Sequence, residues 1–383
     1  MNISKCSMML LVCSFAGLWF PLQLSAQGQC EHGWFPGPKL IEFDVPEAGT
    51  APGLGTQPLA NNSECAIVGT YQDANSVYHG FLRSPDGKIT SFDAPVAGAA
   101  VTAGQGTMAY SINDFGVITG QVEDANNIVH GFVRYPDCHF TIFDAPGAGT
   151  GSAEGTYAYN INSWGTISGE YYDSADASHG FVRWIDGHII TFDAPDAVAA
   201  SGGTYVCEET CINKEGAVTG WYYDASSAVH GYVRWPDGRF TEFDAPGASL
   251  LPFYGTIGGS INQDGTVAGY DVDSNNVAHG FVRTRDGVFT NADDPLASTA
   301  TGEGTGVFSI NYFGALAGTY FDVNSAFHGF SRSPSGTFDE IDAPHAGPGE
   351  LQGTRPSTNN NEGEVVGWYI DGNNLNHGFL WRP

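Results

Sequence analysis

The sequence predicts an all-β fold, a seven-bladed β-propeller with four antiparallel strands in each blade. Three observations lead to this prediction. A His-Gly-aromatic tripeptide occurs seven times, at spacings of 51, 49, 51, 49, 49 and 49 residues, which indicates a repeat architecture. An Asp-x-Pro motif and a Gly-Thr pair recur in step with the tripeptide. Glycine contributes 52 of the 383 residues, which is about twice its ordinary usage and argues against a helical protein.

A single repeat, residues 156–195, contains four short β-type segments separated by turn residues. The segments are 156–161, 166–172, 179–184 and 188–192. Gly165 and Gly187 close two hairpin turns, and a polar loop separates the second segment from the third. Four antiparallel strands in a repeat of about 49 residues match the size of a propeller blade.

The two ends of the repeat series complement each other. Residues 40–46 are a lone copy of the fourth strand, and residues 377–382 are a third-strand copy that ends the series. An N-terminal strand that joins the C-terminal blade would close the ring and remove the free sheet edges. The predicted propeller therefore spans residues 39–383. A β-solenoid is the alternative fold, but it would not need complementary partial repeats at its ends.

The N-terminal segment has the pattern of a secretory signal peptide. Residues 1–26 carry Lys5, an apolar run, and small residues that end at Ala26. We expect the mature chain to begin near Gln27, with a lead segment over residues 27–38. No other stretch approaches the ~20 apolar residues of a membrane span. The sequence predicts a secreted or periplasmic protein with no membrane span in the mature chain.

Five cysteines remain after removal of the signal peptide, and five is an odd number. Cys207 and Cys211 bracket three residues, and in an exported protein we interpret them as a local disulfide. The alternative is a metal pair, but no nearby His or second Cys pair completes a zinc site. The pairing of Cys30, Cys65 and Cys138 stays open.

The charge balance excludes one class of partner. The chain has 14 Lys and Arg against 42 Asp and Glu, which gives a formal net charge of −28. A nucleic-acid binder neutralises phosphates with clustered Lys and Arg, so we expect no nucleic-acid partner.

A histidine and an aspartate recur in every repeat. The histidines are His79, His130, His179, His230, His279, His328 and His377. The aspartates are Asp44, Asp93, Asp144, Asp193, Asp244, Asp293 and Asp342. A group present in every blade is most simply blade architecture, so we predict a structural His–Asp hydrogen bond in each blade rather than metal sites or catalytic dyads.

An arginine and a tyrosine also recur. The arginines are Arg83, Arg134, Arg183, Arg234, Arg283, Arg332 and Arg382, and we expect structural ion pairs with carboxylates. The tyrosines of the second strand are Tyr71, Tyr171, Tyr222, Tyr320 and Tyr369. Because side chains alternate between the two faces of a strand, we interpret these tyrosines as core between blades rather than as a sugar-stacking platform.

The repeats resemble those of bacterial extracellular HAF-repeat proteins, which are named for a His-Ala-Phe tripeptide. The resemblance covers about residues 39–383 and rests on three motifs. They are the Ile-Asn-x-x-Gly turn that ends at Gly165, the Gly-x-Tyr-x-Asp strand that ends at Asp173, and His179-Gly-Phe, where glycine stands in place of alanine. The resemblance implies export and no defined activity.

The loops between second and third strands are rich in carboxylates and amides, as in residues 123–127, 271–276 and 371–374. Calcium is the cation that such oxygen ligands suit. None of these loops ends in the bidentate Glu of a recognised calcium loop, so solvated turns are the preferred interpretation. No cofactor is predicted, and calcium stays open as the alternative for these loops.

Ligand-binding residues are expected where the repeats differ. Loops that lead into the innermost strands line the mouth of a propeller channel, and variable residues on a rigid ring suit binding. The candidates are Gln105, Glu154, Phe253, Tyr254, Glu303, His345, Glu350, Gln352 and Arg355.

The preferred function is an exported, monomeric binding module whose ligand, a glycan or a cell-surface polymer, lies at the channel mouth. One alternative is a propeller enzyme of the lactonase or polysaccharide lyase type that would use His345, Glu350 or a channel metal. Glu154 and Glu303 lie three blades apart, too far to act as a pair of glycosidase carboxylates. Another alternative is an interaction scaffold that binds a protein of the cell envelope.

Overall fold

The computed structural model describes residues 39–99 and 104–383, and it confirms the prediction of an all-β fold. The described chain contains 28 strands and a 3-10 helix, η1 (Ala199–Ser201). The predicted signal peptide, the lead segment 27–38 and Cys30 lie outside the described residues. None of the helical structure in the described part is long and apolar enough to cross a membrane.

The strands recur in four positions of a common unit. The first strands are β2 (Gly55–Asn61), β6 (Gly106–Ile112), β10 (Gly155–Ile161), β14 (Thr204–Val206), β18 (Thr256–Ile261), β22 (Thr305–Ile310) and β26 (Gly353–Asn359). The second strands are β3 (Ile67–Gln72), β7 (Ile118–Glu123), β11 (Ile167–Tyr172), β15 (Val218–Tyr223), β19 (Val267–Val272), β23 (Leu316–Phe321) and β27 (Val365–Ile370). The third strands are β4 (Tyr78–Arg83), β8 (Val129–Arg134), β12 (Ser178–Arg183), β16 (Val229–Arg234), β20 (Ala278–Arg283), β24 (Phe327–Arg332) and β28 (Asn376–Arg382). The fourth strands are β5 (Ile89–Phe92), β9 (Phe140–Phe143), β13 (Ile189–Phe192), β17 (Phe240–Phe243), β21 (Phe289–Asn291), β25 (Phe338–Ile341) and β1 (Lys39–Phe43).

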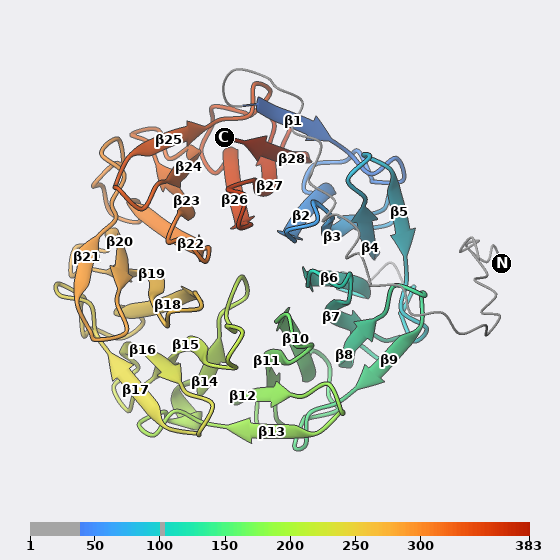
Figure 1. Cartoon of the computed structure of the whole chain (residues 1–383), viewed down its shortest axis with the longest axis horizontal. Helices are drawn as coiled ribbons and strands as arrows, with labels where there is room; N and C mark the ends of the chain where they lie inside the picture. Colours follow the sequence, from blue (N-terminus) through green and yellow to red (C-terminus); the bar gives the residue numbers. More distant parts are fainter. Residues whose placement is uncertain (1–38, 100–103) are drawn as a thin grey trace, which may run out of the picture.

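Successive strands pair antiparallel within each unit, and units 1 to 6 are β2–β5, β6–β9, β10–β13, β14–β17, β18–β21 and β22–β25. Unit 7 is composite. Its strands β26, β27 and β28 are completed by β1, which pairs antiparallel with β28 from Lys39 opposite Arg382 to Phe43 opposite Gly378. Figure 1 shows the units arranged around a common centre, with the first strands innermost and the fourth strands at the rim.

Seven buried asparagines link the units through their turns. They are Asn62, Asn113, Asn162, Asn213, Asn262, Asn311 and Asn360. The side-chain Nδ2 of each donates to the backbone oxygen of the next, at 2.9 to 3.5 Å, and Asn360 donates to the oxygen of Asn62. The hydrogen bonds therefore form a closed cycle. We call this set the asparagine ring.

Each ring asparagine also shapes its own hairpin turn. Asn162 Oδ1 accepts hydrogen bonds from the backbone N–H groups of Trp164 and Thr166, both at 3.0 Å. Gly165 completes this turn with a φ of 77°, a conformation that glycine adopts without steric penalty. A single side chain thus satisfies buried backbone groups of its own unit and of the next.

The core consists of layers between neighbouring units. The aromatic residue of every His-Gly-aromatic tripeptide is buried, and the set is Phe81, Phe132, Phe181, Tyr232, Phe281, Phe330 and Phe379. In the second strand of unit 3, a Cβ added at Gly169 would lie 2.0 Å from the backbone oxygen of Tyr157. The close approach of the first and second strands therefore requires glycine at this position.

The repeated histidines make the predicted hydrogen bonds. In all seven units the histidine Nδ1 lies 2.8 to 3.0 Å from the carboxylate of the repeated aspartate. In the five units that carry the second-strand tyrosine, its ring stacks on the histidine with centroids 4.9 to 5.2 Å apart. These tyrosines are buried, as expected for core residues.

The expectation of ion pairs for the repeated arginines is wrong for six of the seven residues in the described part of the chain. Arg382 alone has one, with Glu364 at 2.7 Å. Five of the others place the guanidinium 4.6 to 4.9 Å from the centre of a Phe ring of the preceding unit, as Arg183 does over Phe143. Aromatic faces rather than carboxylates line the space between units, and a planar guanidinium stacks well on them.

Replacing Asn162 with alanine tests the asparagine ring. The change removes the hydrogen bonds to the backbone oxygens of Asn213 at 3.0 Å and Lys214 at 3.5 Å and two bonds within the turn, and the three shorter bonds contribute about 1 kcal/mol each. We expect the free energy of unfolding, measured by urea denaturation, to fall by about 3 kcal/mol. The matched control is Asn275→Ala, which removes an exposed amide outside the ring. An equal loss of stability in the two variants would contradict the structural role of the ring.

Candidate functional site

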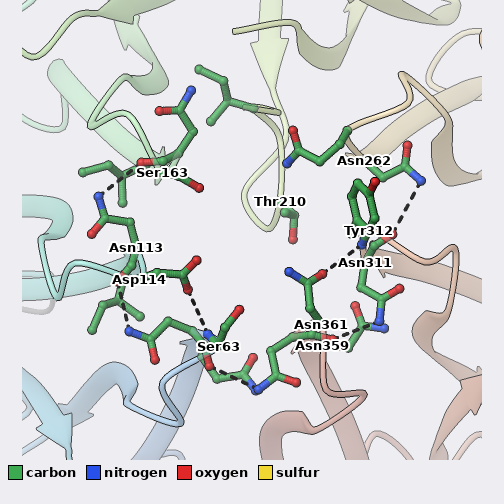
Figure 2. Close-up of a pocket in the computed structure, with 18 of the residues that line it drawn as sticks. Ser63, Asn113, Asp114, Ser163, Thr210, Asn262, Asn311, Tyr312, Asn359 and Asn361 are labelled. Carbon is green, nitrogen blue, oxygen red and sulfur yellow. Dashed lines mark hydrogen bonds between the residues drawn. The ribbon is translucent and has the colours of Figure 1, made fainter. Parts of the chain in front are cut away.

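The first strands of all seven units converge on the axis of the ring, and their turns enclose a cavity of about 150 Å³ (Figure 2). Its polar groups bind one another. Ser309 Oγ donates to Asn359 Oδ1 at 2.9 Å, and Asp114 Oδ1 accepts the backbone N–H of Ser63 at 2.9 Å. These hydrogen bonds link the turns of neighbouring units at this end of the axis.

The disulfide loop of unit 4 crosses the same axis. The predicted bond between Cys207 and Cys211 is confirmed. In Figure 1 the yellow-green loop that follows β14 extends toward the centre of the ring, and Figure 2 shows Thr210 in the axial cavity. The Thr210 oxygen accepts the N–H of Ile261 at 2.9 Å, and Asn160 Nδ2 donates to the oxygen of Cys207 at 3.4 Å. Units 3 and 5 therefore hold the loop in place.

Two further residues of this loop carry carboxylates, Glu208 and Glu209, and a third carboxylate, Glu170, comes from β11. Glu170 is 4% exposed. Its Oε1 accepts the hydroxyl groups of Tyr159 at 3.2 Å and Tyr172 at 3.3 Å. Burial raises the pKa of Glu170 to about 8, and the charge of Glu208 adds to the shift. Loss of hydration and the neighbouring Glu208 likewise raise the pKa of Glu209 to about 8. We call these three residues the acidic cluster.

Arg355, from β26, is the cation that faces the acidic cluster. Its guanidinium lies 4.4 Å from the ring centre of Phe327 and 5.1 Å from that of Trp368. Burial lowers the pKa of Arg355, and the charge of Glu209 opposes that shift. Its charge in turn lowers the pKa of Glu209 against the effect of burial. The disulfide loop thus brings carboxylates of unit 4 within the electrostatic reach of unit 7.

Aromatic side chains form a continuous row beside the acidic cluster, which we call the aromatic arc. Its members are Tyr110, Tyr157, Tyr159, Tyr172, Tyr205, Trp221, Tyr223 and Phe253. Neighbouring ring centres lie 5.2 to 6.3 Å apart, and Tyr172 and Tyr205 interact through their hydroxyl groups. The arc runs from unit 2 through units 3 and 4 to the segment that leads into unit 5. Most of its rings are half-buried, so their remaining surface is open to a ligand.

Four predicted site residues precede a Gly-Thr pair, and the structure places their side chains in the entry loops of their own units. They are Gln105, Glu154, Glu303 and Gln352. Gln105 Nε2 donates to Asn127 Oδ1 at 2.7 Å, and the equivalent Gln352 donates to Asn374 at 2.9 Å. Glu303 accepts the hydroxyl of Ser325 at 2.6 Å. Each of these bonds connects the entry loop to the loop between the second and third strands.

The other predicted residues are divided between the centre and the rim. Arg355 and Phe253 belong to the central site, and Tyr254, half-buried, follows Phe253. His345 is 75% exposed and its Nδ1 lies 2.7 Å from Glu42 Oε2. Glu350 is exposed as well, so the structure places His345 with Glu42 and not with Glu350.

The acidic loops use their carboxylates within the turns. Asp273 Oδ1, for example, accepts the backbone N–H groups of Asn275 at 2.8 Å and Val277 at 2.9 Å. Within residues 39–99 and 104–383, no group of three or more His, Cys, Asp or Glu residues has a geometry that could hold a metal ion.

Sequence reasoning missed most of the acidic cluster and the arc. The signal that could have found Glu208 and Glu209 is the group of three residues that Cys207 and Cys211 bracket, since this segment makes unit 4 three residues longer at this point than the other units. The inner-strand tyrosines carry a weaker signal, since Tyr157 and Tyr159 occupy the first and third positions after a Gly-Thr pair. Both positions vary between repeats, and both lie on the innermost strand of the unit.

Comparisons with known proteins add similarity at the level of architecture. No protein-family model and no curated protein matches the sequence. AofleA from Arthrobotrys oligospora is 11% identical with a TM-score of 0.44, and the match covers 79% of this chain and 90% of that one. A variant of Aleuria aurantia lectin in complex with alpha-methyl-L-fucoside is 12% identical with a TM-score of 0.42, covering 89% and 93%. TolB from Acinetobacter baumannii is 8% identical with a TM-score of 0.40, covering 90% and 79%. Because these TM-scores lie below 0.5, the function has to be argued from the site itself.

The pH dependence of stability tests the environment of Glu170. Its pKa rises from 4.5 to about 8 on folding, so between these values the folded state binds a proton that the unfolded state has released. This group therefore lowers stability as the pH rises through that window, by up to about 1.4 kcal/mol per pH unit. We expect the stability of the Glu170→Gln variant, relative to the parent protein, to increase from pH 5 to pH 8 in urea denaturation. Parallel pH profiles would contradict the buried, protonated carboxyl, because Glu209 is common to both proteins.

Proposed function

We propose that the chain is a closed seven-bladed β-propeller of the HAF-repeat type, exported as a monomer, that binds a glycan near the axis of its ring. The antiparallel pairing of β1 with β28 and the closed cycle of seven asparagine hydrogen bonds support the ring. The signal-like residues 1–26 and the Cys207–Cys211 disulfide support export.

The observation that carries the glycan proposal is the aromatic arc beside the acidic cluster. A sugar presents apolar C–H faces and hydroxyl groups. Half-buried tyrosine and tryptophan rings offer flat apolar surfaces with polar edges, which suit the C–H faces of a sugar. Carboxylates and Arg355 offer strong hydrogen-bond acceptors and donors, which suit the hydroxyl groups of a sugar. The disulfide loop crosses the axis on the turn side, so we expect the ligand to enter from the side on which the chain leads into the first strands.

One observation favours an enzyme as the second candidate. With pKa values of about 8, Glu170 and Glu209 hold their protons near neutral pH. A carboxylic acid that is protonated at neutral pH can serve as a general acid in the cleavage of a glycan. Binding without turnover would leave the first proposal standing alone, whereas release of shorter products would favour the enzyme.

A glycan array probed with residues 27–383 tests the proposal, once with calcium and once with a chelator. We expect saturable binding to a defined glycan class, reduced about tenfold or more by Tyr157→Ala or Tyr205→Ala, since each removes a stacking surface. Tyr312→Ala is the matched control, because Tyr312 is 50% exposed on the turn side.

The absence of binding in both conditions would overturn the glycan proposal. Binding that survives both arc variants would place the ligand elsewhere on the protein. Loss of binding in the chelator alone would assign the contact to a calcium-dependent site instead of the arc.

A further inference from the structure

Unit 5 differs from the other units at two core positions. Asp271 occupies the second-strand position that holds Tyr71, Tyr171, Tyr222, Tyr320 and Tyr369 in five other units. Ala292 follows the fourth strand at the position of Phe43, Phe92, Phe143, Phe192, Phe243 and Ile341. Unit 2 also lacks the tyrosine, but its Val122 is apolar and fully buried. Unit 5 alone has a charged residue there.

The space that a tyrosine would fill in unit 5 is open. In unit 3, a Cβ added at Gly147 of the neighbouring loop would lie 3.3 Å from the Tyr171 hydroxyl. At the equivalent Gly247, beside unit 5, an added Cβ would meet nothing within 4 Å. A cavity of about 410 Å³ occupies this place. Its lining includes Pro246, Gly247, Asp271, Asp273, His279 and Asn291.

Asp271 points into this cavity without a partner. The residue is 4% exposed, it lines the cavity, and no residue of the described chain donates a hydrogen bond to its carboxylate. Burial raises the pKa of Asp271 to about 6, which leaves the group mainly ionised at neutral pH. The Asp271 carboxylate therefore offers its oxygens as hydrogen-bond acceptors to a ligand that enters the cavity.

His279 supplies a flat wall that the structure holds in position. Its Nδ1 lies 3.0 Å from Asp293 Oδ2, and Asp293 Oδ1 accepts the backbone N–H of Gly280 at 2.7 Å. In the five tyrosine-bearing units the equivalent histidine face is covered by the tyrosine ring. In unit 5 the histidine side chain is 35% exposed, more than in any other unit.

We propose that this cavity binds a planar guanidinium group, of the kind that an arginine side chain presents, stacked on His279 and hydrogen-bonded to Asp271. A guanidinium is flat, so it fits where a tyrosine ring lies in the other units. It stacks on aromatic faces and offers paired N–H donors to one carboxylate. No Lys or Arg lies among the residues that line the cavity, and its basic side chain is His279. These residues are distinct from the acidic cluster and the aromatic arc, and the inference is independent of the proposed glycan site.

Three small probes test the shape and charge of the ligand: Nα-acetyl-arginine amide, Nα-acetyl-lysine amide and Nα-acetyl-citrulline amide. Binding to the full mature chain is measured by saturation-transfer NMR and calorimetric titration. We expect saturable binding of the arginine probe and binding of the lysine probe weaker by about tenfold, since an ammonium is a point charge that does not stack. The neutral citrulline probe keeps the planar shape without the charge, and we expect it not to bind.

Two variants locate the site. Asp271→Asn removes the charge at constant shape, and we expect it to weaken arginine binding by about tenfold or more. Asp271→Tyr restores the residue of the other units, and we expect it to abolish binding while raising the melting temperature, because it fills the cavity. Asp322→Asn, which changes a turn aspartate of unit 6, is the control that should leave binding unchanged.

Equal binding of the three probes, or none of the arginine probe at millimolar concentration, would overturn the proposal. The proposal would also be overturned if Asp271→Asn bound the arginine probe with unchanged affinity and had the same melting temperature as the parent protein. Failure of this test leaves the glycan array result unaffected, because the arc variants and the Asp271 variants change different units of the ring.

Discussion

Each asparagine of the ring hydrogen-bonds through both the oxygen and the nitrogen of its side-chain amide. The shape of every turn and the links between the units depend on these bonds. The oxygen of Asn162 closes its own hairpin turn, and the nitrogen reaches the backbone of Asn213 in the next unit. The last link, from Asn360 to Asn62, joins residues that are far apart in sequence. Because the amides are buried, an unpaired member would leave polar groups without water, which favours completion of the cycle as a whole.

This regular frame makes irregular features possible at the centre. Six units end their first strand in a short turn, whereas unit 4 adds the disulfide loop, and neighbours on both sides hold it across the axis. The loop brings Glu208 and Glu209 near the buried Glu170, where loss of hydration and the repulsion of Glu208 act on Glu170 and Glu209. Their pKa values rise for that reason, and Arg355 from unit 7 offsets part of the effect on Glu209. One insertion thus gives the axis an asymmetric polar site, with carboxylates from units 3 and 4 near Arg355 from unit 7.

The same frame tolerates changes at the rim. The histidine–aspartate hydrogen bond is present in unit 5 although the tyrosine that covers the histidine elsewhere is absent. A repeat protein distributes its stability over many equivalent contacts, so one unit can lose a core side chain and keep its strands paired. A cavity such as the one in unit 5 is found by comparing equivalent positions between units, because the other units show which side chain normally fills the space.

The sequence by itself determined the features that repeat. The spacing of the histidines and aspartates located every unit and predicted the bond between them, and the partial repeats at the two ends anticipated the pairing of β1 with β28. The tertiary structure decided which side chains meet across the boundaries between units. The arginines stack on Phe rings of neighbouring units, and the carboxylate of Glu170 meets tyrosines and the disulfide loop across unit boundaries. The physical reason is that periodic spacing reports contacts imposed by the period, whereas a ring also joins residues whose meeting depends on side-chain direction, size and burial. The asparagine ring combines the two, since its turn motif is visible in the sequence while its closure is visible only in three dimensions.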